Sequence, residues 1–152
     1  MQSITDELVQ KYKNFYQGGT YYYSDPKKIT KKPNGGDRWE TKRAFGNFEV
    51  DLEKYLFGTI DKGIVLSPLI KPENKCLFGA IDVDGEVYKN LEAKQKILKI
   101  IRSWSIVPCL SKSGGLHLYL FLKHAEPAKD LITVLRYFRN ILGLPKQTEI
   151  FP

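Results

Sequence analysis

Cysteine, methionine and histidine are scarce in this sequence of 152 residues, which has two Cys, one Met and two His. Cys76 and Cys109 stand alone in apolar sequence and lack the closely spaced pairs of a zinc site. A disulfide between them stays open as an alternative, but two lone thiols favour a reduced protein. We therefore expect a cytoplasmic location.

Long hydrophobic runs, repeats and low-complexity tracts are also missing. No apolar run approaches the length of a membrane span, so we expect no membrane partner. The opening residues do not have the pattern of a signal peptide. The hydrophobic fraction of 42% and the length of 152 residues are enough for a globular protein with a sizeable core.

Positive charge is in excess, with 24 Lys and Arg against 17 Asp and Glu and a formal net charge of +7. Such a balance favours a polyanionic partner, most often nucleic acid, although it also serves general solubility. Residues 24–37 predict an exposed, mobile basic loop rich in Lys, Pro, Asn and Gly. The candidate phosphate-binding residues in and after this loop are Lys27, Lys28, Lys31, Lys32, Arg38, Lys42 and Arg43.

The N-terminal half mixes helical and strand patterns. Residues 3–17 predict a helix with Ile4, Leu8, Tyr12 and Phe15 along its apolar side. Three consecutive tyrosines at 21–23 predict a strand, whose rings either pack on a sheet or stack on bases. A short strand or an irregular segment is expected within residues 39–48, a short helix over 50–57 and a strand over 63–69.

The C-terminal half has a clearer pattern. Alternating apolar residues predict strands over 77–83, 105–110, 116–122 and 148–151, and helical spacing predicts helices over 89–104 and 127–142. The order is βαββαβ, which predicts an α+β fold with a ferredoxin-like sheet. In that topology the third and last strands flank the first, and both run antiparallel to it.

Strand alternation then brings polar residues together at one end of one sheet face. We expect Leu77, Ile81 and Val83 to face the helices. The opposite, open face would carry Asp82, Asp84, His117 and Glu149. Taken singly, the aspartates and the histidine have ordinary interpretations, as an Asp-Gly turn with solvated acids and as a structural strand histidine. Their convergence favours a functional site.

Three carboxylates without a thiolate favour Mg²⁺ or Mn²⁺, and three acids suffice for a two-metal site that serves phosphoryl transfer. The turn before His117 offers hydroxyls, a cation and close-approach backbone N–H groups that suit phosphate oxygens. Its residues are Ser111, Lys112, Ser113, Gly114 and Gly115. The alternative interpretation is a hairpin turn that binds no ligand.

Three motifs in the sequence resemble those of the archaeo-eukaryotic primase superfamily, and within it the primases of TOTE conflict systems and similar phage or plasmid primase-polymerases. The motifs are Ala80-Ile-Asp-Val-Asp-Gly85, Ser111-Lys-Ser-Gly-Gly-Leu-His117 with the Leu-Tyr-Leu-Phe that follows, and Thr148-Glu-Ile-Phe-Pro152. The middle motif is the most specific. The N-terminal half resembles the family more loosely, at residues 15–22 and at the 63–69 strand.

The resemblance implies a DNA primase-polymerase that transfers nucleotides from NTP or dNTP onto primers on a single-stranded DNA template. Asp82, Asp84 and Glu149 would bind the metals, and His117 would contact the incoming triphosphate with Ser111, Ser113 and Lys112 nearby. Bacterial, archaeal, phage or plasmid origin and a replicative helicase or further primase region as partner are also implied. We expect one catalytic domain over 1–152, with an N-terminal module over 1–75 and an active-site module over 76–152.

Two departures and two alternatives accompany this interpretation. Relatives of the family usually continue beyond the position of Pro152, so we expect a trimmed catalytic core or a fragment. The third acid of the superfamily is often an Asp in another local motif, whereas this sequence has Glu149.

The same βαββαβ order serves non-catalytic RNA-recognition domains, for which Tyr119 and Phe121 would stack bases. A replication-initiator nuclease would need paired histidines, and the expected cluster has only His117.

Overall fold

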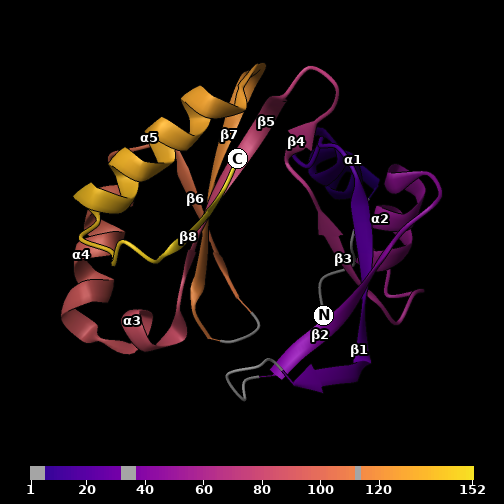
Figure 1. The fold of residues 1–152 in the computed structure, drawn as a ribbon, viewed down its shortest axis with the longest axis horizontal. Helices are drawn as coiled ribbons and strands as arrows, with labels where there is room; N and C mark the ends of the chain where they lie inside the picture. The colour runs from indigo at the N-terminus through magenta and orange to yellow at the C-terminus, as the bar shows by residue number, and fades with distance from the viewer. Residues whose placement is uncertain (1–5, 32–36, 112–113) are drawn as a thin grey trace. The chain divides into compact units, whose positions relative to one another are not determined.

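A computed structural model describes residues 6–31, 37–111 and 114–152, and for residues 25–31 and 37–41 it describes the backbone only. The chain has a mixed α+β fold with antiparallel sheets and divides into two compact units, residues 1–67 and 68–152 (Figure 1). The boundary falls at Ser67/Pro68, whereas the sequence led us to expect it at 75/76. Each unit has its own sheet.

The first unit has a three-stranded antiparallel sheet in the order β2-β1-β3, accompanied by two helices. Val9 and Leu52 are the buried residues of the two helices, and the Lys13 ammonium of the first is 2.7 Å from a Glu53 carboxylate oxygen of the second. The elements are α1 (Asp6–Phe15), β1 (Tyr21–Lys31), β2 (Asp37–Arg43), α2 (Phe48–Leu56) and β3 (Gly63–Leu66).

Two expectations for the first unit are wrong. Leu8, Tyr12 and Phe15 are 40–52% exposed, because α1 turns Val9 inward instead of the expected stripe. The basic segment expected as a loop over 24–37 is largely strand: β1 continues to Lys31, and β2 begins at Asp37. Pairing between β1 and β2 provides hydrogen-bond partners for the backbone there. The register of this pairing shifts between Asp25 and Ile29.

The second unit contains the expected βαββαβ order, with a short additional strand before it and one additional helix after its first long strand. Its elements are β4 (Leu69–Ile70), β5 (Lys75–Val83), α3 (Gly85–Lys89), α4 (Leu91–Ile101), β6 (Ile106–Leu110), β7 (Leu116–Pro127), α5 (Ala128–Ile141) and β8 (Glu149–Phe151). The expected neighbours of the first strand are confirmed, because β7 and β8 flank β5 and both run antiparallel to it. The short β4 pairs with the beginning of β5.

The helix expected over 89–104 is present as α4, over Leu91–Ile101, and the separate short helix α3 precedes it. Asn90 has extended backbone angles (φ −67°, ψ 118°), and its side chain accepts a 3.0 Å hydrogen bond from the Ala93 N–H. Asn90 thus caps α4, as its position in the sequence suggested. The five residues before it form α3 directly after Asp84.

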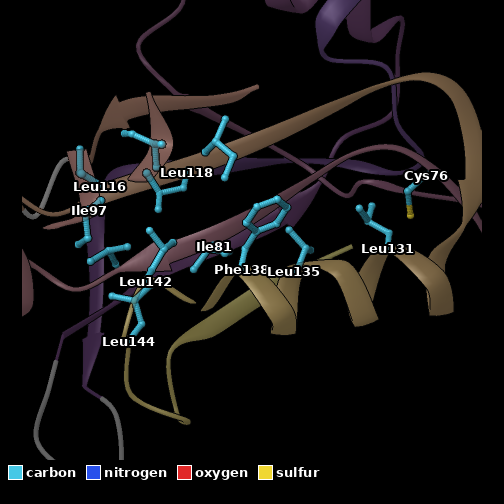
Figure 2. Packing of buried hydrophobic residues seen from close by; sticks show 13 residues of the cluster. Cys76, Ile81, Ile97, Leu116, Leu118, Leu131, Leu135, Phe138, Leu142 and Leu144 are labelled. Atoms are coloured by element: carbon cyan, nitrogen blue, oxygen red, sulfur yellow. The ribbon is translucent and has the colours of Figure 1, made fainter. Parts of the chain in front are cut away.

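The hydrophobic core of the second unit lies between the sheet and the helices α4 and α5 on one of its faces (Figures 1 and 2). Ile81 and Leu118 of the sheet are 1% exposed, as is Leu135 of α5, so the expected helix-facing pattern of β5 and β7 is largely confirmed. Leu77 is the exception. Cys76 joins the core in its place, because the pairing of β5 with β7 shifts register between Cys76 and Phe78.

Candidate active site

Four polar residues lie in register across the four main strands of the second unit. Asp82 of β5 pairs with His117 of β7 on one side and with Glu149 of β8 on the other. His117 also pairs with Cys109 of β6. Directly opposite residues of antiparallel strands share a face, so these side chains form one row across the sheet. The expected convergence of Asp82, His117 and Glu149 on one face is therefore confirmed.

The row lies on the face opposite the hydrophobic core. The immediate neighbours Ile81, Val83, Leu116 and Leu118 are all buried in the core, and strand alternation turns Asp82 and His117 to the other side. The side chains of Asp82 and His117 are 34% and 39% exposed, and Glu149 is exposed. A ligand therefore has access to the carboxylates and to the imidazole.

The imidazole of His117 has a polar neighbour at each ring nitrogen. Its Nε2 is 3.4 Å from Asp82 Oδ1, and its Nδ1 is 3.4 Å from the Tyr119 hydroxyl. The Tyr119 ring also meets the imidazole edge to face, with centroids 6.0 Å apart. Both polar contacts are long, so the imidazole is oriented without being tightly bound. Such a group can exchange these neighbours for a ligand.

Asp84 lies just beyond the end of β5, two residues after Asp82 and one before α3. Its side chain is exposed and makes no capping hydrogen bond to that helix, while its backbone carbonyl accepts from the Tyr88 N–H at 3.0 Å. The backbone of Asp84 is thus held by α3, and its carboxylate stays available to a ligand.

The turn between β6 and β7 is closed by its own hydrogen bonds. Ser111 Oγ accepts from the Gly115 N–H at 3.0 Å, and the Ser111 N–H donates to the Gly115 carbonyl at 3.0 Å. Gly114 has φ +82°, a conformation that glycine adopts without strain. The Gly115 N–H, expected to face phosphate, is therefore used inside the turn. Lys112 and Ser113 lie outside the described residues.

Gly115 also packs against the strand end that carries the two aspartates. A Cβ atom on Gly115 would lie 2.1 Å from the Val83 carbonyl oxygen, 2.9 Å from the Gly85 nitrogen and 3.1 Å from the Asp84 carbonyl carbon. Only glycine allows this approach, because those atoms are backbone and cannot turn away. The contact links the turn before His117 to the position of Asp84.

The carboxylates are chemically suited to a hard divalent cation such as Mg²⁺ or Mn²⁺. Asp82 and Glu149 face each other across paired strands, and Asp84 follows on the same strand end. In the parts of the chain that the structure describes, no group of three or more His, Cys, Asp or Glu side chains is arranged to hold a metal ion. The type of donor therefore fits the expected ions, and their binding stays a prediction.

The basic residues expected to contact nucleic acid are described only in part. Lys42 and Arg43, at the end of β2, have exposed side chains. The structure describes the backbone but not the side chains of Lys27, Lys28, Lys31 and Arg38. Lys32 lies outside the described residues. Their contact with nucleic acid stays a prediction.

Cys109 and Tyr119 are the site residues to which the sequence analysis gave no role in catalysis. The position of Cys109 follows from the tight turn at 111–115, which pairs Leu110 with Leu116 and places Cys109 opposite His117. The position of Tyr119 follows from strand alternation, since it is two residues after His117 on β7. Further along β7 from His117, the rings of Tyr119 and Phe121 stack, with centroids 5.7 Å apart and planes at 17°.

Neither a scan of known family models nor a search of curated proteins returned a match for this chain. Among the helices within the described ranges, none combines the length and apolar character needed to cross a membrane. The resemblance to archaeo-eukaryotic primases therefore depends on the three sequence motifs alone.

Proposed function

We propose that this chain is a metal-dependent nucleotidyltransferase of the primase-polymerase type. The observation that carries the proposal is the cross-strand row of Asp82, His117 and Glu149, with Asp84 at the end of the same strand as Asp82. Two of the three motifs that resemble the primase family contain a residue of this row, His117 or Glu149, and the third contains both aspartates. Residues from three distant segments thus meet where phosphoryl transfer would need them.

In the proposed reaction, a primer 3′-hydroxyl attacks the α-phosphate of a nucleoside triphosphate bound at the row. A bond forms between the 3′-oxygen and the α-phosphorus as the hydroxyl loses its proton to water. The bond from the α-phosphorus to the bridging oxygen breaks, and pyrophosphate leaves. Asp82, Asp84 and Glu149 would hold divalent cations, which supply charge stabilisation for the attacking and leaving oxygens.

We assign His117 to binding the triphosphate. An imidazole N–H can donate to phosphate oxygens, and the contact with Tyr119 orients the ring. Ser111 closes the turn beside it through the Gly115 N–H. We assign Ser111 and Gly115 to holding the turn, with Lys112 and Ser113 as the candidate phosphate contacts of the same motif.

The template and primer would be nucleic acid strands bound by the basic residues of the first unit. The net charge of +7 and the exposed Lys42 and Arg43 support this assignment. A helicase or a further primase region is a compatible partner for such an enzyme.

Primer extension with Mn²⁺ or Mg²⁺ tests this proposal directly. We expect metal-dependent extension by the wild type and a loss of at least about 100-fold in Asp82→Ala, since even the groups behind metal ligands are worth about 10- to 100-fold. DNA binding by this variant should persist. The same assay on Asp84→Ala checks the second ligand, and full activity in both variants would refute the metal site.

Nucleotide binding should be followed beside extension. Metal-dependent binding of a nucleoside triphosphate without extension would indicate a catalytic core that needs further chain for template and primer. No nucleotide binding at all would exclude the polymerase assignment.

A second function, a non-catalytic nucleic-acid-binding module, is favoured by the aromatic rings on the same sheet face. Phe78 lies 6.0 Å from Phe121 and 6.3 Å from Tyr119 between ring centroids, and Tyr119 and Phe121 are stacked. Stacked aromatic residues of this kind bind bases in RNA-recognition domains. Two carboxylates on the central strand oppose this function, because they repel phosphate. Nucleic-acid binding that is indifferent to Mg²⁺ and Mn²⁺ would support it.

A further inference from the structure

Phe45 is the most exposed of the large apolar side chains that the structure describes, at 86%. It follows β2 directly, after two cationic residues and one small buried residue, in the order Lys42, Arg43, Ala44, Phe45. A phenylalanine that is almost wholly in water has no packing role within its own unit. The ring is therefore available to a ligand.

A cation covers one face of this ring. The Arg43 guanidinium carbon lies 5.7 Å from the Phe45 ring centroid, within the range of a cation–π contact. The contact orients the ring and leaves it largely open to solvent. Lys42 and Arg43 are both exposed, so positive charge surrounds the ring on its N-terminal side.

The backbone on both sides of Phe45 is fixed. The Ala44 N–H donates to the Tyr21 carbonyl at 3.1 Å, and Ala44 is 7% exposed. On the other side, Asn47 Oδ1 accepts from the Glu49 N–H at 2.9 Å and begins α2. Phe45 is thus presented from a short anchored segment, which lowers the entropy lost when a ligand binds.

We propose that Phe45 is a stacking platform for one unpaired base of a single-stranded nucleic acid, with Arg43 and Lys42 bound to the adjacent phosphates. An aromatic ring beside cations is the combination with which proteins bind single strands without reading their sequence. The inference rests on the proposed function for its polynucleotide and adds the site that holds the single strand.

Equilibrium binding of a fluorescein-labelled oligothymidylate to the full chain, without nucleoside triphosphate, tests the platform. We expect Phe45→Ala to lower the affinity by about 5- to 100-fold, the effect of losing one stacked base. Phe45→Leu keeps an apolar side chain without a π face and should bind as weakly. Phe45→Trp should bind at least as tightly as the wild type, and the added indole fluorescence should be quenched by the oligonucleotide.

Phe57→Ala is the matched control, because Phe57 is a 43% exposed phenylalanine at the other end of α2. It should bind like the wild type. Thermal unfolding of each variant checks the fold, and the Phe45 variants should unfold like the wild type because the side chain is exposed. The same series with oligouridylate tells whether the strand is better taken as DNA or RNA.

Wild-type affinity in Phe45→Ala, or full binding by Phe45→Leu, would overturn the platform while leaving the polymerase proposal intact. A loss in Phe57→Ala equal to that in Phe45→Ala would also overturn it. If the wild type itself binds neither oligonucleotide, the inference fails, and nucleotide binding then decides separately whether the proposed function stands. If the Phe45 variants bind the oligonucleotide as expected but the wild type neither binds a nucleoside triphosphate nor extends a primer, the stacking platform stands and only the catalytic assignment is lost.

Discussion

Asp51 of α2 shows how much one polar side chain contributes to the first unit. Its Oδ2 atom accepts the hydroxyl groups of Tyr21 at 2.7 Å and of Tyr23 at 2.5 Å, both from β1. The hydrogen bond from Tyr23, together with that from Tyr21, lowers the pKa of Asp51 although burial opposes this. Burial first and then Asp51 raise the pKa of Tyr21, and Asp51 raises that of Tyr23.

These pKa shifts predict the pH range over which the cluster stabilises the fold. The lowered pKa of Asp51 contributes free energy of unfolding that is present above the ordinary carboxyl pKa of about 4 and is lost as the pH falls through the lowered value. The raised pKa values of the two tyrosines also contribute free energy of unfolding. This contribution is fully present below the ordinary tyrosine pKa of about 10 and is lost as the pH rises through the raised values. Urea unfolding across the pH range should therefore show weaker stability at both ends.

Asp51→Ala should lower the free energy of unfolding at neutral pH by about 1–3 kcal/mol, because it leaves a buried hydroxyl of Tyr21 without its acceptor. Asp51→Asn keeps an acceptor oxygen and should lose less, with a flatter response to acid. Equal stability of Asp51→Ala and wild type in urea unfolding would contradict this account.

At the scale of elements, the turn between β6 and β7 packs against the end of β5 and fixes the position of the backbone there. Gly115 lies against the backbone of Val83 to Gly85, so any side chain there must push the turn away from Asp84. Gly114 differs, because a Cβ atom at that position would meet nothing within 4 Å. The two neighbouring glycines thus have separate roles, one for packing and one for the backbone conformation.

Gly115→Ala should lower the free energy of unfolding by about 1–3 kcal/mol, the usual cost of forcing atoms into a packed site. It should also weaken metal-dependent nucleotide binding, because Asp84 is displaced. Gly114→Ala should cost about 1–2 kcal/mol for its left-handed backbone and leave nucleotide binding in place. Calorimetric titration of a nucleoside triphosphate with Mn²⁺ compares the two, and unchanged binding in Gly115→Ala would remove its positioning role.

At the scale of the whole molecule, the excess of positive charge should govern affinity for nucleic acid. Binding to a single strand weakens with salt, and each phosphate contact contributes about 0.7 to the slope of log affinity against log salt. Lys42 is exposed at the end of β2, within the basic stretch expected to bind the strand. A change of this one residue should therefore be visible in the slope.

Lys42→Gln should reduce the magnitude of the slope by about 0.7 in oligothymidylate binding measured over a range of salt. Lys99→Gln is the matched control, since Lys99 is an exposed lysine on α4 and its loss changes the net charge equally. Equal slopes for both variants would show that net charge, and no defined contact at Lys42, causes the salt dependence.

Local pattern was enough to predict much of the second unit. Alternation along 77–83 and 116–122 placed Asp82 and His117 on the open face, and the βαββαβ order placed Glu149 beside Asp82. Asn90 was predicted as a helix cap from its position alone. These predictions succeed because strand alternation and capping depend on residues close in sequence.

Only the tertiary structure decided the features that depend on distant partners. The register shift between Cys76 and Phe78 turned Cys76 into the core in place of Leu77, and it arises from pairing with β7. Cross-strand pairing made most of the expected basic loop into β1 and β2. The approach of Gly115 to Asp84 joins two segments separated by a whole helix pair and a strand. No local sequence pattern predicts such contacts, because strand register and close packing depend on segments that are distant in the sequence.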